Sequence, residues 1–138
     1  MAGMRISMRK IREVLRLTHD RQMQAHALNN LGSAYRTLGD YTRARESYEA
    51  ANRLAPDAML PVVGLGLVAQ KTGDINQAAG YYSQAVKVQA TDVGYLLLSQ
   101  ALEKSGRKLE AEAAFEQAHR LSGDLKRTQE MVDQLLAE

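Results

Sequence analysis

The sequence of 138 residues contains no cysteine and no tryptophan, only two prolines and a single phenylalanine. The absence of cysteine excludes a disulfide framework, thiol catalysis and thiolate metal sites. With so few prolines, long irregular loops are not expected. The uncharged run from Ala58 to Gln70 is too short and too rich in glycine to cross a bilayer. No membrane association is therefore predicted.

Charge is modest overall but uneven along the chain, with a net charge of +2. The basic side chains of the first 24 residues are Arg5, Arg9, Lys10, Arg12, Arg16 and Arg21. Only Glu13 and Asp20 oppose them. Without aromatic platforms, nucleic-acid binding through this segment would be non-specific and salt-dependent, so no specific nucleic-acid partner is predicted. No apolar segment follows the basic start as in a secretory signal, and we expect a cytoplasmic location.

Four columns of residues recur at a spacing of 34 and then 33 residues. Glycines form one column, alanines form two, and aromatic rings form the fourth. The columns are Gly39, Gly73 and Gly106; Ala44, Ala78 and Ala111; Ala51, Ala85 and Ala118; and Tyr48, Tyr82 and Phe115. A fixed period of this length predicts stacked copies of one supersecondary unit, which makes this a repeat protein.

Each copy has the pattern of two helices joined by a tight turn. In the first copy, the stripe of the first helix consists of Leu28, Leu31, Gly32 and Tyr35. Gly39 then fits the left-handed residue that follows a helix. The stripe of the second helix consists of Tyr41, Ala44, Tyr48 and Ala51. Small residues let the two helices approach, and the ring fills the space beside them. The pattern predicts an all-α protein built from antiparallel helix pairs.

These copies resemble the tetratricopeptide repeat (TPR) family. The matching residues of the first copy are Leu28, Leu31, Gly32, Tyr35, Gly39, Tyr41, Ala44, Tyr48, Ala51 and Pro56. Those of the second are Val62, Leu65, Gly66, Gly73, Ile75, Ala78, Tyr82 and Ala85, with departures at Ala69 and Ala90. Those of the third are Tyr95, Leu98, Leu102, Gly106, Ala111, Phe115 and Ala118, with departures at Ser99, Lys108 and Gly123. The resemblance implies a right-handed solenoid of three helix pairs.

The expected organisation has three parts. Residues 1–24 form a basic N-terminal helical leader, an extra helix with an apolar stripe of Met8, Ile11, Val14 and Leu15. Residues 25–123 hold the three repeats, at 25–58, 59–91 and 92–123. Residues 124–138 form one more helix with Asp124 as its N-cap. The resemblance implies that this last helix is a capping helix, which covers the open apolar side of the final repeat.

The leader also resembles, over Met4 to Leu17, the first helix of the helix-turn-helix in some bacterial insertion-sequence transposases. A turn and a recognition helix would have to follow, but the repeats begin instead. One helix alone cannot present base-reading side chains in a major groove. DNA binding is therefore not carried over to this chain.

The family resemblance implies that the first helices of the three pairs line a concave face where partners bind. The residues that we expect to point out of this face are Asn29, Ser33, Arg36, Leu60, Val63, Leu67, Gln70, Lys71, Val93, Leu96, Gln100 and Glu103. The five aliphatic ones form an apolar centre with polar residues at both ends. An exposed apolar patch with a polar rim is typical of a protein-binding site. We predict a non-catalytic adaptor or scaffold for a peptide or helix with apolar side chains.

The residues of the same face argue against one kind of partner and leave two further occupants open. Family members that grip the acidic tail of heat-shock chaperones use basic and amide side chains as a carboxylate clamp. The matching positions here hold Asn29, Ser33, Gly64, Val93 and Leu97, so the clamp is missing apart from Asn29. Two further occupants stay open, namely the N-terminal helix folded back into the groove and a helix from a second copy. Either would make the chain a self-associating structural module, in the second case a homo-oligomer.

Catalytic and cofactor sites are not indicated. The histidines are His19, His26 and His119, and none has a second histidine or a carboxylate at a ligand-like spacing except by chance. No glycine-rich phosphate loop follows a strand pattern. The acidic residues between Glu110 and Glu116 lie beside basic ones, as on an ordinary solvated helix face. We expect no enzyme activity, no cofactor and no metal.

Overall fold

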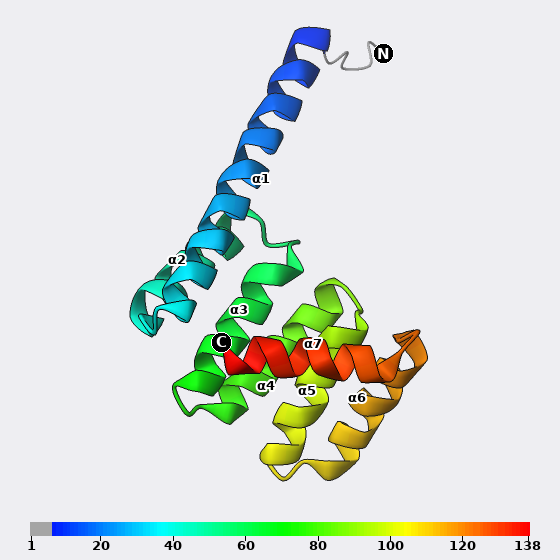
Figure 1. Ribbon diagram of the computed structural model, residues 1–138. Coiled ribbons are helices and arrows are strands. Elements are labelled where there is room, and N and C mark those ends of the chain that lie inside the picture. Colours follow the sequence, from blue (N-terminus) through cyan, green and yellow to red (C-terminus); the bar gives the residue numbers. More distant parts are fainter. Residues whose placement is uncertain (1–6) are drawn as a thin grey trace.

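The computed structural model describes residues 7–138, and within them it contains seven helices and no strand. The helices are α1 (Met8–Thr37), α2 (Tyr41–Leu54), α3 (Met59–Lys71), α4 (Ile75–Val88), α5 (Asp92–Lys104), α6 (Lys108–Leu121) and α7 (Leu125–Ala137). Figure 1 shows that α1–α2, α3–α4 and α5–α6 form three stacked antiparallel pairs. The all-α helical repeat predicted from the sequence is confirmed.

The turn within each pair is built on the glycine column. Gly39, Gly73 and Gly106 have φ values of 80°, 90° and 79°, in the left-handed region where a side chain would be strained. In the first turn, the amides of Gly39 and Asp40 donate to the carbonyls of Arg36 and Tyr35, which is the hydrogen-bond pattern of a Schellman motif. The Asp40 side chain then caps α2 by accepting from the Arg43 amide. Gly39 therefore ends α1, and Asp40, the next residue, starts α2.

The aromatic column sets the spacing between the helices. Tyr48 and Tyr82 are almost fully buried, and the rings lie against helices that carry glycine at the contact. A Cβ atom on Gly32 or Gly64 would lie 2.7 or 2.4 Å from the Tyr48 ring, and one on Gly66 would lie 2.4 Å from the Tyr82 ring. Only a glycine fits at these contacts, so the ring can pack directly on the backbone of α1 and α3.

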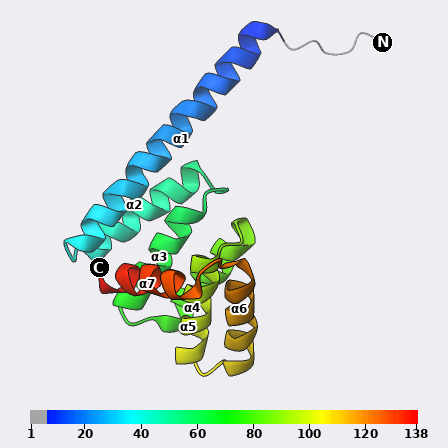
Figure 2. The same ribbon diagram turned by 45° about the vertical axis from the view of Figure 1, so that its right-hand side comes forward.

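The N-terminal segment is helical as expected, and it continues without a break into the first helix of the first repeat. The resulting helix α1 spans 30 residues. Its outer half, residues 8–24 (the stem), is exposed at every position, and Ala25 is the first buried residue. Figures 1 and 2 show the stem projecting away from the other helices. Arg5 and the Met4–Ile6 part of the transposase resemblance lie outside the described residues.

The C-terminal helix α7 forms where the sequence predicts it, with Asp124 as its N-cap. Its position differs from that of a helix that covers the last repeat, because it packs mainly on α5 and only slightly on α6. Figure 1 shows α7 (red) running across α5 and α3 toward the C-terminal end of α1. Among residues 7–138, no helix has the length and hydropathy required to span a membrane.

Candidate functional site

The first helices of the three pairs, α1, α3 and α5, line one face of the repeats, which we call the groove. The polar end of the Tyr48 ring reaches this face. Its hydroxyl shares a hydrogen bond with the Ser33 hydroxyl at 3.0 Å and accepts one from Arg36 Nε at 3.4 Å. The buried ring and its glycine contacts therefore fix the position of two residues that the sequence placed in the site.

Helix α7 lies in the groove with its apolar face inward. Val132 is fully buried, and Leu135 and Leu136 pack against the core cluster that contains Val63, Leu67 and Leu96. α7 is amphipathic, and its exposed side carries most of its charged residues. The groove therefore already holds an amphipathic helix, supplied by the chain itself.

Polar contacts hold both ends of α7. At its C-terminal end, Arg36 donates to the carbonyl of Leu135 at 3.1 Å and forms an ion pair with Glu138 at 3.3 Å. At its N-terminal end, the Thr128 hydroxyl donates to Asp92 of α5 at 2.8 Å. Between them, the Gln100 amide donates to Gln129 at 3.2 Å. Because a helix dipole is negative at its C-terminal end, the positions of Arg36 and Asp92 favour the orientation that α7 has.

The apolar centre expected to be exposed is mostly covered. Val63, Leu67 and Leu96 are buried, Val93 is half-buried, and only Leu60 is exposed. The expectation that these side chains form an open patch is therefore wrong for all but Leu60. The physical reason is that α7 removes them from water together with its own apolar side chains. The alternative in which the N-terminal helix folds back into the groove is wrong, because residues 8–24 are all exposed and α7 lies in the groove instead.

The polar residues expected at the edge of the site have three different environments. Arg36 is buried and bonded within the chain, so its expected position on an open rim is wrong. Gln70 is half-buried and accepts from the Tyr82 hydroxyl at 2.9 Å, while burial raises the pKa of Tyr82 above its ordinary value. Lys71 and Glu103 are exposed as expected. The Oδ1 atom of half-buried Asn29 is enclosed and accepts no hydrogen bond from a described residue.

Three hollows remain along the groove. Two of about 220 and 130 Å³ lie beside the C-terminal end of α7, and both are lined by Leu67 and Leu135. The third, of about 360 Å³, lies at the base of the stem between α1 and the start of α3, and exposed Leu60 is part of its wall. α7 therefore fills the groove incompletely, and the end near the stem stays open.

The sequence contains a signal for the unusual position of α7. In the column where the first helices of the repeats carry Gly32, Gly66 and Ser99, the fourth member at the same spacing is Val132. A branched side chain there does not permit the close backbone approach that stacking as a further repeat helix requires. Val132 is buried in the groove instead. Phe115 and Leu109 of α6, on the open side of the last repeat, remain exposed.

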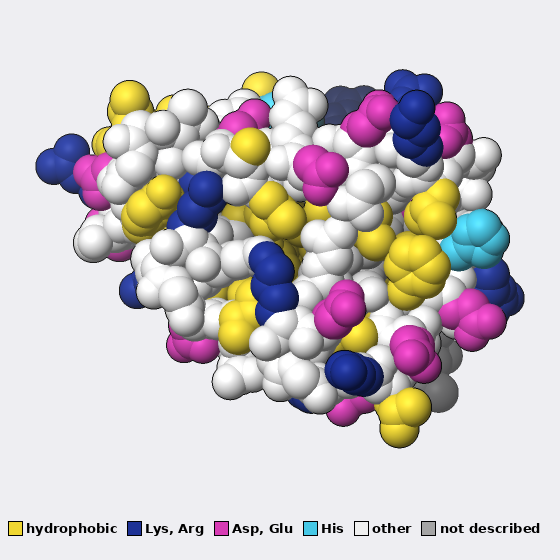
Figure 3. All heavy atoms as spheres, turned by 60° about the horizontal axis from the view of Figure 1, so that its bottom comes forward, with side chains coloured by type: hydrophobic (Ala, Val, Ile, Leu, Met, Phe, Trp, Pro, Cys, Tyr) yellow, Lys and Arg dark blue, Asp and Glu magenta, His cyan; other side chains and the backbone are white. Residues whose placement is uncertain are grey.

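A larger hollow, of about 880 Å³, lies on the open side of the last repeat, where exposed Leu109 and Phe115 line it. Figure 3 shows hydrophobic side chains on one face in separate groups, with Lys, Arg, Asp and Glu side chains between them. Among residues 7–138, no three histidine, aspartate or glutamate side chains lie in an arrangement that could hold a metal ion. The groove differs from these surfaces because it holds an amphipathic helix with polar contacts at both ends, and we therefore take it as the candidate site.

Comparisons with known proteins agree with this geometry. One similar structure is the second TPR of Spaghetti (RPAP3) bound to an HSP90 peptide, with a TM-score of 0.71 and 21% identity over 76% of this chain and 97% of that chain. Another is the Yersinia enterocolitica type III secretion chaperone SycD in complex with a peptide of the translocator YopD. Its TM-score is 0.70 and its identity 22%, over 81% of this chain and 88% of that chain. These likenesses show the fold.

Sequence models place the chain in a family. A comparison with curated protein sequences finds no match. Two models of the tetratricopeptide repeat match residues 25–58 and 63–124, which together make up most of the chain. Proteins of this kind are in general non-catalytic interaction modules, and this supports a role as a protein-interaction adaptor. The chain belongs to the tetratricopeptide repeat family.

Proposed function

We propose that this chain is a non-catalytic adaptor that binds an amphipathic helix of a partner protein in its groove, where the partner displaces α7. The observation that carries this proposal is the position of α7, because an occupied groove identifies the kind of ligand that it accepts. Helix-in-groove recognition uses the same contacts between an apolar helix face and an apolar channel.

The contacts that hold α7 are few enough to be exchanged. Val132 is its only fully buried aliphatic side chain, and burying one such side chain contributes about 1.5–3 kcal/mol. Leu135 and Leu136 are half-buried, and the hollows of about 220 and 130 Å³ adjoin them. A partner helix with larger apolar side chains would fill these hollows and bury more surface than α7 does.

The charges of the groove would orient the partner. Arg36 favours the C-terminal end of a helix and an acidic residue beside it, as Leu135 and Glu138 provide in α7. An extended acidic tail is a poorer candidate, because the positions of the family's carboxylate clamp hold Val93 and buried Leu97. The ligand expected here is therefore a helix with an apolar face and an acidic C-terminal end.

The experiment measures binding of a labelled peptide with the sequence of residues 124–138 to the whole chain. In the unaltered chain, α7 competes with the peptide for the groove. In the variant Val132→Asp, the tethered α7 should leave the groove, and the peptide should bind about tenfold or more tightly. Equal affinity for both proteins would contradict the proposal.

A pair of valine variants tests the place of binding in the Val132→Asp background. Val93 is half-buried and lines a groove hollow, whereas Val88 is half-buried at the end of α4 and lines no groove hollow. Val93→Asp should remove peptide binding, and the matched Val88→Asp should retain it. A doubled solution mass of the unaltered chain, with α7 exchanged between two copies, would favour the self-associating role instead.

A further inference from the structure

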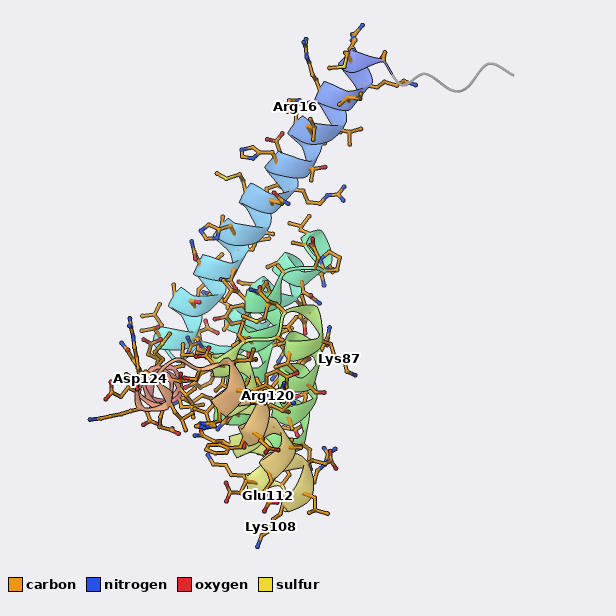
Figure 4. The ribbon with its side chains drawn as sticks, turned by 90° about the vertical axis from the view of Figure 1, so that its right-hand side faces the viewer. Arg16, Lys87, Lys108, Glu112, Arg120 and Asp124 are labelled. Carbon is orange, nitrogen blue, oxygen red and sulfur yellow. The ribbon has the colours of Figure 1, made fainter. Side chains whose placement is uncertain are left out.

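The stem is the part of the described chain with the largest unsatisfied apolar surface outside the repeats. Met8, Val14 and Leu15 are 62%, 60% and 64% exposed, and Ile11 is 37% exposed. Figure 4 shows the stem, marked by Arg16, extending beyond the helices of the repeats. A helix of this length without tertiary contacts is only marginally stable in water. A second element that packs along the stem would stabilise it.

The apolar stripe of the stem faces the same side as the body of the protein. Ile11 and Val14 stand 18 residues before Asn29 and Gly32, which is about five helical turns, so each pair shares one face. Gly32 packs on the Tyr48 ring of α2, and Asn29 lines the hollow at the base of the stem. The stripe therefore overhangs this hollow, and Leu60 at its wall extends the apolar surface onto α3.

Basic side chains flank the stripe on both sides. At about 100° per residue, Arg12 lies beside the stripe on one side and Lys10 and Arg21 lie beside it on the other. The acidic residues of the stem are on the opposite face, where Arg16 pairs with Glu13 at 2.7 Å and with Asp20 at 3.5 Å. The charges next to the stripe are thus all positive, and an occupant of the stripe meets only cations at its edges.

We propose that the stem binds an acidic amphipathic helix of a partner protein, which lies along the stripe and ends in the hollow at the stem's base. Apolar side chains of the partner would cover Ile11 and Leu15, and its carboxylates would pair with Arg12 and Arg21, as at the flanking positions of a coiled coil. This surface meets the groove only at that hollow, at the end that α7 leaves open, and its occupation does not require α7 to move.

The geometry disfavours two other occupants. Two stems packed together would place the basic flanks of both copies beside each other, and like charges there oppose pairing. A flat anionic membrane would attract a basic amphipathic helix. However, α2 and α3 extend on the same side as the stripe, so the body obstructs a plane laid along it. A single helix is narrow enough to lie along the stripe beside α2 and α3.

The test uses the whole chain and a synthetic helical peptide with leucines along one face and glutamates on both sides of them. Binding is measured by fluorescence anisotropy, with a scrambled peptide of the same composition as reference. We expect Leu15→Ser and Arg12→Glu each to weaken binding about tenfold. Arg9→Glu makes the same charge change on the face opposite the stripe, and we expect it to weaken binding about twofold or less.

Several outcomes would overturn the proposal. Equal binding of the scrambled peptide, or equal losses for Arg9→Glu and Arg12→Glu, would show a non-specific charge effect. Stronger binding to vesicles of phosphatidylcholine with phosphatidylserine than to the peptide, lost in Leu15→Ser, would identify a membrane surface. A dimer of the unaltered chain that Leu15→Ser converts to a monomer would identify a second copy. Because all three substituted residues are exposed, circular dichroism should show an intact fold for every variant.

Discussion

The stem and α7 are both amphipathic helical segments outside the regular repeats, yet one projects into solvent and the other lies in the groove. The stem has no buried residue between Met8 and Gln24, whereas Thr128 and Val132 of α7 are 3% and 0% exposed. The stem is the longer of the two, and each segment carries six apolar side chains. Apolar content therefore does not decide which segment folds back.

The connection to the repeats explains the difference. From Met8 to Leu31 the chain contains no glycine or proline, so nothing interrupts the helix between the stem and the first repeat. Folding the stem back would require the loss of helical hydrogen bonds in the middle of α1. α7 instead follows a connection of Ser122, Gly123 and Asp124, in which the chain direction changes freely. The break in the helical structure before α7 therefore allows this helix to fold back and occupy the groove.

The largest expected difference between the two segments comes from one substitution made in both. Val132→Asp places a charge in a fully buried site and should lower the free energy of unfolding by on the order of 3 kcal/mol, or detach α7. Val14→Asp makes the same substitution at a position that is 60% exposed and should change the free energy of unfolding by about 0.5 kcal/mol or less. Urea denaturation measures both values.

Hydrogen exchange separates the two results of Val132→Asp. If α7 detaches, the amides of α7 exchange rapidly while those of α3 and α5 stay protected. The stem amides should exchange rapidly in every variant. A Val14→Asp protein that loses as much stability as Val132→Asp would show that the stem is packed in solution, and the contrast between the two segments would fail.

A second pair of variants compares a glycine of α1 that lies under the Tyr48 ring with an exposed glycine of α4. In α1, Gly32→Ala places a methyl group 2.7 Å from the Tyr48 ring and should lower the free energy of unfolding by about 1–3 kcal/mol. The matched variant Gly80→Ala in α4 meets nothing within 4 Å and should stabilise the protein by about 0.5–1 kcal/mol. Thermal unfolding, monitored by circular dichroism, shows whether each substitution raises or lowers the stability of the protein. A neutral Gly32→Ala would mean that α1 is not clamped by the ring.

The repeat architecture could be predicted from the sequence because its causes are local and periodic. The left-handed residues Gly39, Gly73 and Gly106, the capping aspartates and the ring columns each act within one copy or between neighbours. These residues therefore recur in the sequence at a fixed period, from which the repeat can be recognised. The division of the chain into turns and helices follows from the same residues.

The state of the groove could not be predicted in the same way. It depends on contacts between the first repeat and the C-terminal helix, such as those of Arg36 with Leu135 and Glu138, which lie 99 and 102 residues away in the sequence. A period of 33 or 34 residues carries no record of such contacts. Leu67 and Leu96 were expected to be exposed because the repeats alone leave them so, and a helix outside the repeats covers them. Val132, which follows Gly32, Gly66 and Ser99 at the repeat spacing, is a local sign of this arrangement.

The smallest expected effect concerns the polar anchor at the start of α7. Thr128→Val removes the hydroxyl that donates to Asp92 at 2.8 Å and leaves the carboxylate without that bond, which should cost about 1 kcal/mol. The matched Thr18→Val on the stem removes a hydroxyl that bonds only to the carbonyl of Val14, four residues earlier, at 2.8 Å. Because this bond is exposed to water, its loss should change stability by about 0.5 kcal/mol or less.

Urea denaturation at equal protein concentration compares the two threonine variants, and the trans peptide of residues 124–138 adds a functional reading. If Thr128 helps to hold α7, then Thr128→Val should also admit the peptide to the groove more readily than the unaltered chain does, by about fivefold for a loss of 1 kcal/mol. Thr18→Val should leave peptide affinity unchanged, because the stem does not touch α7. Equal stability losses without a gain in peptide binding would show that Thr128 acts only on the propensity of its own helix, and that the hold on α7 rests on Val132 and Arg36 alone.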